Sequence, residues 1–252
     1  MSDKVRRILM GLLACVFLVS AGFFVKYYME YRKGDQIYET AREFVVEAGE
    51  ATATEEEPEG RSIDFESLQA VNEDVFGWIT IPDTGVDYPL LKAYDNKYYL
   101  THTYDNQWSS YGSIFLEPRN KDINDRHVVL YGHNMVNHSM FGALMDYKEQ
   151  DFADSHSLIH ITLPDRELTY QVFSVYTAHV DSPTYYMSFA DDSTFQQMID
   201  HMKSNSQIAS DVTPTTEDQI LTLSTCTPAG AKKYRFVVNA VLIEEIPKTT
   251  TE

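Results

Sequence analysis

Two β-branched runs near the C-terminus constrain most strongly what this chain can fold into. In the first run, Ile220, Thr222, Ser224 and Cys226 share one face, because side chains alternate along a strand. The second run, YRFVVNAVLI, covers residues 234–243. A proline and a glycine between the runs are typical of a turn. The pattern therefore predicts a hairpin whose incoming strand ends at Cys226.

The predicted hairpin brings a thiol and a guanidinium to one edge of a sheet, because Arg235 begins the outgoing strand. A cysteine thiol has an ordinary pKa of about 8.5, so a nucleophilic cysteine needs a nearby cation or imidazole to supply the thiolate. His133 is the candidate imidazole, since Gly132 allows the apolar strand before it to break sharply. We therefore expect Cys226, His133 and Arg235 to form a catalytic group.

The chain has only two cysteines, Cys15 and Cys226. Cys15 lies in an apolar run of the kind that enters a membrane, so the two cannot form a structural disulfide inside a folded domain. An unpaired cysteine in an exported protein indicates a reactive thiol. A buried, inert cysteine is the general alternative. The neighbours of Cys226 favour reactivity.

The composition is that of a folded, sheet-rich protein. Of 252 residues, 43% are hydrophobic and 13% are aromatic, which excludes a chain that is disordered throughout. The formal net charge of -18 argues against nucleic acid as a partner. The acidity fits an ordinary solvated surface, and a cationic partner is the alternative.

An apolar run near the N-terminus predicts a single membrane-spanning helix over residues 8–28. The run is close to the length of roughly 20 residues that a bilayer requires. Basic residues in the segment 1–7 indicate that the N-terminus is cytoplasmic and that the rest of the chain is extracellular. A signal peptide cleaved after the small residues 19–21 is the alternative, and the aromatic and basic residues that follow disfavour it.

The segment 29–62 is rich in Glu, Ala and Thr, and it predicts a stalk that is helical at first and then flexible. A globular domain is expected over residues 63–247, followed by a polar tail at 248–252. A short amphipathic helix should open the domain, with Asp64 as its N-cap.

Turn signals and hydrophobic periodicity predict a mainly β domain with a few helices, one of them inserted just before the cysteine strand. Pro89, in the second strand of the first hairpin, indicates an edge position. The expected elements are a hairpin formed by FGWITI and VDYPLL, a short helix at 95–99, strands at 113–116 and 126–131, a helix at 139–148, a hairpin formed by 157–163 and 167–180, and a helix that starts from a capping box at 193–196.

Three sequence blocks resemble the sortases, and class B sortases most closely. They are TLSTC at 222–226, YGHNM at 131–135, and Arg235. The similarity extends over about residues 63–247 and includes the segments GWITIPDT, DNKYYL and GSIFLEPRN. This combination is far more specific than an isolated cysteine or histidine.

The resemblance implies a closed β-barrel whose groove presents His133, Cys226 and Arg235, and a cysteine transpeptidase outside a Gram-positive cell. Such an enzyme recognises a C-terminal sorting motif beginning with Asn-Pro on another exported protein and cuts after its Thr. The acyl group then passes to an amine of a peptidoglycan precursor or of a pilin lysine. By general chemistry, Cys226 attacks the carbonyl, Arg235 holds the oxyanion or a substrate carbonyl, and His133 transfers the proton.

Five further residues are candidates for substrate binding. Ser224 shares the face of Cys226, and a simple strand residue is its alternative. Thr225 is a candidate to donate its backbone N–H to the oxyanion. The resemblance implies that Tyr185 and Tyr186 form a wall of the substrate groove, and a packed aromatic pair is the alternative. Leu91 is a weaker candidate of the same kind.

The sequence predicts neither a metal site nor a cofactor. The histidines other than His133 show no metal-binding spacing, and His127 lies in an apolar strand, which is typical of a core histidine. A non-catalytic surface module, a β-barrel that binds a partner from a membrane stalk, is the alternative function. The sequence leaves open whether the acceptor amine belongs to the cell wall or to a pilin.

Overall fold

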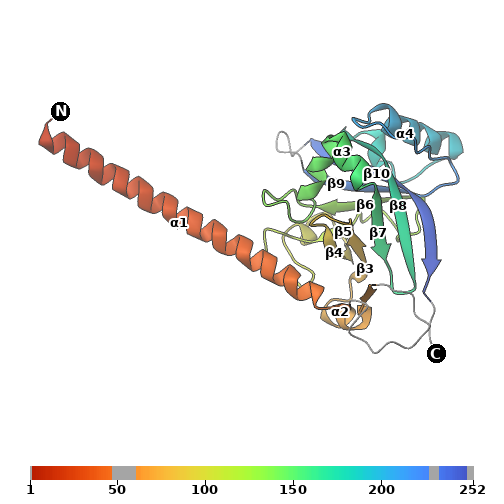
Figure 1. The fold of residues 1–252 in the computed structure, drawn as a ribbon, viewed down its shortest axis with the longest axis horizontal. Coiled ribbons are helices and arrows are strands. Elements are labelled where there is room, and N and C mark those ends of the chain that lie inside the picture. The colour runs from red at the N-terminus through yellow and green to blue at the C-terminus, as the bar shows by residue number, and fades with distance from the viewer. Residues whose placement is uncertain (1, 47–60, 227–232, 249–252) are drawn as a thin grey trace.

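The computed structural model describes residues 2–46, 61–226 and 233–248, without the side chain of Cys226. Within these residues, eight strands close into a barrel in the order β10-β8-β7-β3-β4-β5-β6-β9 (Figure 1). The barrel strands are β3 (Val75–Thr80), β4 (Asp87–Lys92), β5 (Ile114–Leu116), β6 (His127–Gly132), β7 (Leu158–Thr162), β8 (Arg166–His179), β9 (Ile220–Cys226) and β10 (Tyr234–Pro247). The fold is therefore mainly β, as the sequence pattern predicts, and a closed barrel, as the resemblance implies.

Short helices connect the strands, and one long helix precedes them. The helices are α1 (Asp3–Arg42), α2 (Phe65–Val71), η1 (Tyr98–Leu100), η2 (Gly142–Lys148), α3 (Gln150–Ser155), η3 (Pro183–Tyr185) and α4 (Asp192–Ser204). The expected N-cap of α2 is confirmed, since the Asp64 carboxylate accepts a hydrogen bond of 3.0 Å from the Ser67 N–H. The segment expected to be helical over 139–148 forms the 3-10 helix η2.

The strand pairs at the closure of the barrel bring distant residues to one end. β9 runs antiparallel to β10, with Cys226 opposite Arg235, as the hairpin pattern predicts. On its other side β9 runs parallel to β6, with Thr225 opposite Gly132. The residue after β6, the end of β9 and the start of β10 therefore lie at the same end of the barrel. The turn expected at 228–230 lies outside the described residues.

Two local expectations are wrong. Pro89 does not mark an edge strand, because β4 pairs with β3 on one side and with β5 on the other. Its missing N–H is tolerated because the pairing with β5 begins only at Leu90. The N-cap of α4 is Asp191, whose carboxylate accepts a hydrogen bond of 2.8 Å from the Thr194 N–H, and not the serine of a capping box at 193–196.

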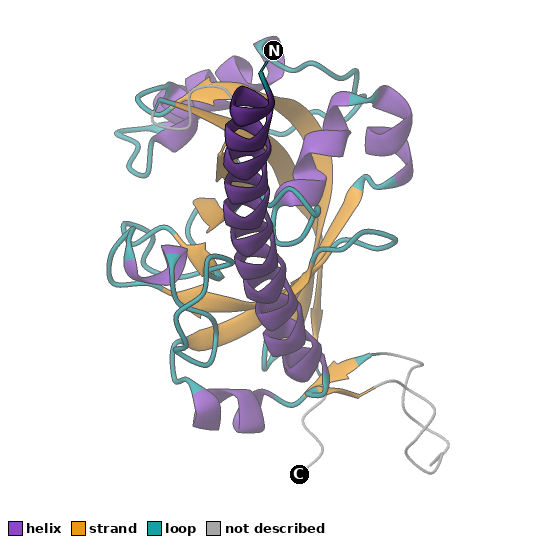
Figure 2. Ribbon diagram, turned by 90° about the vertical axis from the view of Figure 1, so that its left-hand side faces the viewer, coloured by secondary structure: helices purple, strands orange, loops and turns teal. Residues whose placement is uncertain are grey.

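Helix α1 extends away from the barrel and meets it near α2 (Figures 1 and 2). It is long and apolar enough to cross a membrane, and its apolar part makes no buried contact with the barrel. Near its C-terminal end, Gly34, Ile37, Tyr38 and Ala41 are buried. The helical start of the predicted stalk therefore packs on the barrel.

The acidic segment after α1 begins and ends at one short ribbon. Strand β1 (Val45–Val46) pairs with β2 (Ser62–Ile63), with Val45 opposite Ile63. Residues 47–60, where the flexible part of the stalk was expected, lie outside the described residues. The pairing of β1 with β2 holds the two ends of this segment together. The segment follows the part of α1 that packs on the barrel.

His127 is the core histidine that the apolar strand predicts. It is 2% exposed, its Nδ1 lies 2.9 Å from the Tyr186 carbonyl oxygen, and its Nε2 lies 3.0 Å from the Thr222 hydroxyl. Burial lowers the pKa of His127 to about 4. The imidazole is therefore neutral at physiological pH.

Acidification should destabilise the fold through His127. In the unfolded chain its pKa is near the ordinary value of 6.5, so below that pH the unfolded state binds a proton that the folded state does not. The stability that His127 contributes is complete above about pH 6.5 and is lost as the pH falls toward about 4, by about 3 kcal/mol in all. Denaturant unfolding of the full chain at pH steps across this window measures the loss.

The variant His127→Gln should lose less stability than the wild type over the same pH window, because it removes the titrating group. His138→Gln is the matched control, since His138 is exposed. A pH dependence in His127→Gln as steep as that of the control would contradict the assignment.

Candidate active site

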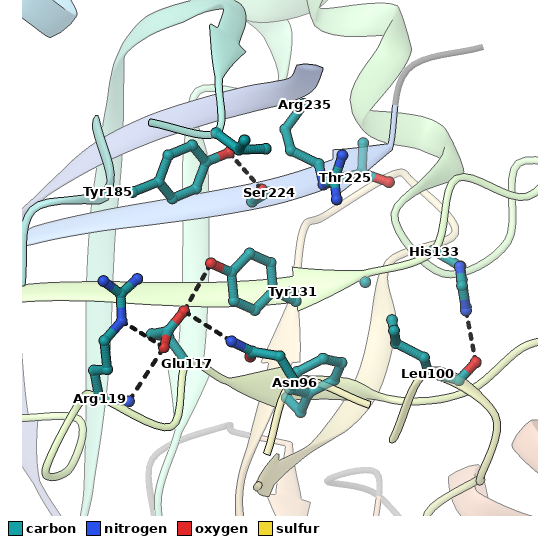
Figure 3. Close-up of a pocket in the computed structure, with 13 residues that line it drawn as sticks. Asn96, Leu100, Glu117, Arg119, Tyr131, His133, Tyr185, Ser224, Thr225 and Arg235 are labelled. Carbon is teal, nitrogen blue, oxygen red and sulfur yellow. Dashed lines mark hydrogen bonds and ion pairs between the residues drawn. The ribbon is translucent and has the colours of Figure 1, made fainter. Parts of the chain in front are cut away.

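A cavity of about 270 Å³ opens at the end of the barrel where β6 and β9 stop. Its lining includes five of the residues expected at the site: His133, Tyr185, Ser224, Thr225 and Arg235. It also includes residues that the sequence did not single out, among them Asn96, Leu100, Glu117, Arg119 and Tyr131 (Figure 3). The cavity thus combines an imidazole, two guanidinium groups, a carboxylate and several hydroxyl groups.

His133 lies directly after β6, half-buried, and its ring is oriented by a backbone carbonyl. Its Nε2 lies 2.7 Å from the Leu100 carbonyl oxygen. A carbonyl oxygen only accepts hydrogen bonds, so Nε2 carries the hydrogen. Nδ1 is then the nitrogen of the neutral ring that can accept a proton. Sequence reasoning found no group to orient this histidine, because every residue has a backbone carbonyl and the residue type does not indicate which carbonyl accepts the bond.

Gly132 is required by close packing at the turn into His133. A Cβ at this position would lie 2.4 Å from Ile114 Cδ1 and 2.7 Å from Phe141 Cδ2. These distances are too short for real contacts, and Phe141 is fully buried, so a larger residue would displace the segment that carries His133.

Arg235 is half-buried at the start of β10 and lines the cavity. Its Nη1 donates a hydrogen bond of 3.0 Å to the Tyr234 carbonyl oxygen. The backbone of Cys226 pairs with that of Arg235, while the Cys226 side chain lies outside the described part of the structure. The structure therefore brings His133 and Arg235 to one cavity, next to the strand end at Cys226.

The wall of the cavity contains two of the expected substrate-binding residues in direct contact. The Tyr185 and Ser224 hydroxyls are 2.9 Å apart and form a buried hydrogen bond. Thr225 also lines the cavity, and its hydroxyl is buried without a hydrogen-bond partner among the described residues. A buried hydroxyl without a partner costs free energy, which a bound substrate could recover.

Tyr186 and Leu91 do not line the cavity. The side chain of Tyr186 is 46% exposed, and its carbonyl accepts the hydrogen bond of His127. Leu91 is fully buried in the hydrophobic core of the barrel, where its strand neighbours are Val75 in β3 and Phe115 in β5. It therefore lies away from a substrate in this cavity.

Sequence reasoning missed a buried carboxylate in the cavity wall. Glu117 is 1% exposed, and it accepts hydrogen bonds from the Tyr131 hydroxyl at 2.8 Å and from Arg119 Nε at 2.9 Å and backbone N at 3.2 Å. Asn96 Nδ2 contacts the same carboxylate at 3.4 Å (Figure 3). The only signal in the sequence is a glutamate that ends an apolar run, followed two residues later by an arginine.

The donors around Glu117 keep it charged. Burial alone would raise the pKa of Glu117, but the hydrogen bonds from Arg119 and Tyr131 outweigh burial and leave the pKa below its ordinary value. Burial and the neighbouring Glu117 carboxylate raise the pKa of Tyr131, so its hydroxyl stays protonated and donates. The carboxylate thereby fixes the orientation of Tyr131 and Arg119 at the cavity.

No group of three or more His, Cys, Asp or Glu side chains is placed to hold a metal ion within 2–46, 61–226 and 233–248. The imidazole of His133 can transfer a proton, and the guanidinium of Arg235 can stabilise an anion.

Replacement of Glu117 by Gln should lower the free energy of unfolding by about 1–3 kcal/mol. Hydrogen bonds to a charged acceptor are lost, and the new amide NH₂ faces the donors of Arg119 and Tyr131, to which it cannot bond. Chemical denaturation at neutral pH measures this change. Glu217→Gln is the matched control, since Glu217 is exposed. A loss no larger than that of the control would show that Glu117 does not hold this part of the wall.

The sequence matches a known family over most of the barrel. Residues 79–243 match the sortase domain. The sortase B of Listeria monocytogenes is 35% identical over 182 residues, which make up 71% of this chain and 74% of that protein. The sortase B of Staphylococcus aureus is 37% identical over 182 residues, or 71% and 75% of the two chains.

Solved structures of sortase B have the same fold. A Staphylococcus aureus sortase B–substrate complex gives a TM-score of 0.67 at 36% identity and covers 71% of this chain and 84% of its own. A sortase B complexed with triglycine gives the same score and identity, with coverages of 71% and 85%. The sortase B of Bacillus anthracis in complex with AAEK1 gives a TM-score of 0.72 at 34% identity, with coverages of 86% and 99%.

The family match in sequence and the similarity to solved sortase B structures both include the barrel. We conclude that the chain belongs to the sortase family of cysteine transpeptidases, and within it to class B.

Proposed function

We propose that this protein is a membrane-anchored sortase that cleaves the C-terminal sorting motif of other exported proteins and transfers the acyl group to an amine, through a thioester on Cys226. The observation that carries the proposal is that His133 and Arg235 line one cavity, beside Thr225 and the end of β9. Family membership indicates the class of reaction. The cavity contains the imidazole and the guanidinium to which we assign proton transfer and anion stabilisation.

In the first half-reaction, the Cys226 thiol gives its proton to His133, and the resulting thiolate attacks the scissile carbonyl, so that a C–S bond forms and the carbonyl oxygen becomes an oxyanion. Arg235 is permanently cationic and stabilises that oxyanion or holds a neighbouring substrate carbonyl. When the intermediate collapses, the C–N bond breaks and His133 donates a proton to the leaving amine. A thioester remains on Cys226.

In the second half-reaction, an acceptor amine attacks the thioester carbonyl. His133 removes a proton from the attacking nitrogen, the new C–N bond forms, and the C–S bond breaks to restore the thiolate. Because Nε2 donates to Leu100, Nδ1 is the nitrogen that carries these protons. The ring therefore keeps its contact with Leu100 through both half-reactions.

The substrate is a peptide in extended form, and the acceptor is a primary amine. Related sortase B proteins form complexes with a substrate and with triglycine. In this chain, Leu100, Phe115 and Val180 give the cavity an apolar part, while Ser224 and Thr225 supply hydroxyls. A motif beginning with Asn-Pro fits this mixture of apolar surface and hydrogen-bonding groups. The acceptor is the amine of a peptidoglycan precursor or of a pilin lysine.

The N-terminal helix anchors the enzyme. Lys4, Arg6 and Arg7 precede the apolar part of α1 and favour a cytoplasmic N-terminus. A single crossing then leaves the barrel on the extracellular face of the membrane.

Incubation of the full chain with a library of sorting-motif peptides and either triglycine or a lysine amine should give ligated products, identified by mass. Cys226→Ala should abolish both cleavage and ligation, because no thioester forms. A thiol-directed alkylating reagent should inactivate the wild type in parallel with labelling of Cys226. Binding of peptides without cleavage by the wild type, together with an unreactive Cys226, would favour the non-catalytic module.

Removal of the Arg235 guanidinium should slow turnover by about 10²–10³-fold, because the loss of one oxyanion donor raises the barrier by about 2.7–4 kcal/mol. Arg235→Ala and Arg235→Lys should both be impaired, since a lysine lacks the planar fork. Steady-state kinetics of peptide cleavage measure the effect. Arg126→Ala is the control, because Arg126 pairs with Asp192 outside the cavity. Equal rates in the Arg235 and Arg126 variants would remove Arg235 from the mechanism.

A further inference from the structure

The C-terminal end of α1 is built into the barrel by close contacts. Gly34 lies against the ring of Tyr111, and a Cβ at this position would be 2.5 Å from Tyr111 Cδ2. One turn later, Tyr38 is 3% exposed and its ring lies against those of Tyr88, Tyr104 and Tyr111. A glycine at the contact and a buried tyrosine beside it hold the helix in one position.

One chain of contacts runs from Tyr38 to the imidazole of His133. The Tyr38 hydroxyl donates to the Gly112 carbonyl oxygen and lies 3.3 Å from Ser113 Oγ. Gly112 has a φ of +55°, and a Cβ there would lie 2.8 Å from the Leu100 carbonyl oxygen. This is the oxygen that orients His133 Nε2. Tyr38 therefore fixes the backbone segment that packs directly against the acceptor of the histidine.

A second chain of contacts reaches the loop 133–141, which begins with His133. The Tyr111 hydroxyl donates to Asp35 Oδ1 of α1 at 2.7 Å and accepts a hydrogen bond from Asn137 Nδ2, also at 2.7 Å. Asn137 lies within this loop. One tyrosine hydroxyl thus connects the helix directly to the loop of the catalytic histidine.

The same loop is also held at its far end. The ring of Tyr88 packs edge-on against Tyr38, with ring centroids 5.1 Å apart, and its hydroxyl accepts a hydrogen bond of 3.0 Å from the Met140 N–H. The next residue, Phe141, donates its N–H to the His133 carbonyl oxygen at 2.9 Å. The backbone of His133 and its imidazole are therefore each linked to Tyr38 by a short series of contacts.

We propose that the docked end of α1 positions His133 for catalysis, with Tyr38 as the main positioning residue and Tyr111, held by Asp35, as the second. The proposal rests on the proposed function for the role of His133, and it assigns to the juxtamembrane helix a task beyond anchoring. Tyr38 touches neither substrate nor reacting atoms. It acts through the Leu100 carbonyl and through the loop 133–141.

The experiment compares two buried tyrosine hydroxyls in the full chain, solubilised in detergent micelles. Tyr38→Phe removes the bond to Gly112 and keeps the ring. Tyr170→Phe is the matched control, because the fully buried Tyr170 donates to Gln219 Oε1 at 2.6 Å and does not line the cavity. The measurements are kcat and KM for peptide cleavage, the unfolding midpoint, and the ¹⁵N signals of the His133 imidazole, assigned with a His133→Asn variant.

Tyr38→Phe should lower kcat by about 3- to 30-fold with little change in KM, which is the usual size of an effect carried through intermediate residues. Its His133 nitrogen signals should shift, because the hydrogen bond to Leu100 loosens. Tyr170→Phe should leave kcat and these signals unchanged, although both variants lower the unfolding midpoint. Equal kcat and equal nitrogen signals in the two variants would overturn the positioning role.

A pair of glycine variants tests the same proposal without removing a hydroxyl. Gly34→Ala forces a methyl group against Tyr111, whereas Gly22→Ala, in the same helix, meets nothing within 4 Å. Gly34→Ala should lower kcat and shift the His133 signals, and Gly22→Ala should do neither. If the wild type cleaves no sorting peptide, the proposed function fails, while the nitrogen signals of these variants still decide whether the helix positions His133.

Discussion

The parallel pairing of β6 with β9 is the constraint on which the active site depends. With Gly132 opposite Thr225, both strands stop at the same end of the barrel, and β10 starts there because it runs antiparallel to β9. Parallel neighbours require a long crossover, which here contains η2, α3, β7, β8 and α4. The histidine therefore precedes the cysteine by many residues in sequence and still lies near it in space.

The group that orients the histidine differs from that of a Ser-His-Asp triad, where a carboxylate holds the ring. The backbone carbonyl of Leu100 fixes the opposite tautomer, with the hydrogen on Nε2 and Nδ1 left as the base, and it adds no full negative charge. The nearest buried carboxylate described in the cavity wall, Glu117, is occupied by Arg119 and Tyr131. The orientation of His133 then depends on how firmly the backbone around Leu100 is held, and Gly112, which accepts the hydrogen bond of Tyr38, packs against it.

Local sequence signals predicted the strands well, because alternation and turn residues act within a few positions. The Cys226 hairpin, the core role of His127 and the cap at Asp64 are of this kind. What the sequence did not reveal depends on pairing between distant segments. Leu91 was predicted to bind substrate, but it packs in the core of the barrel. Pro89 was predicted to lie at an edge, but β5 pairs with its strand from Leu90 onward. The hydrogen bond between Glu117 and Tyr131 and that between the Leu100 carbonyl and His133 also join segments that are distant in sequence.

The docking of α1 has a consequence for where the reaction takes place. From Tyr28, where the apolar run ends, to Tyr31, whose ring packs edge-on against Tyr111, the helix rises only about 4.5 Å. If the apolar part of α1 crosses a bilayer, as proposed, the continuous helix fixes both the height and the tilt of the cavity above the membrane surface. Substrates would then reach the cavity close to the lipid headgroups.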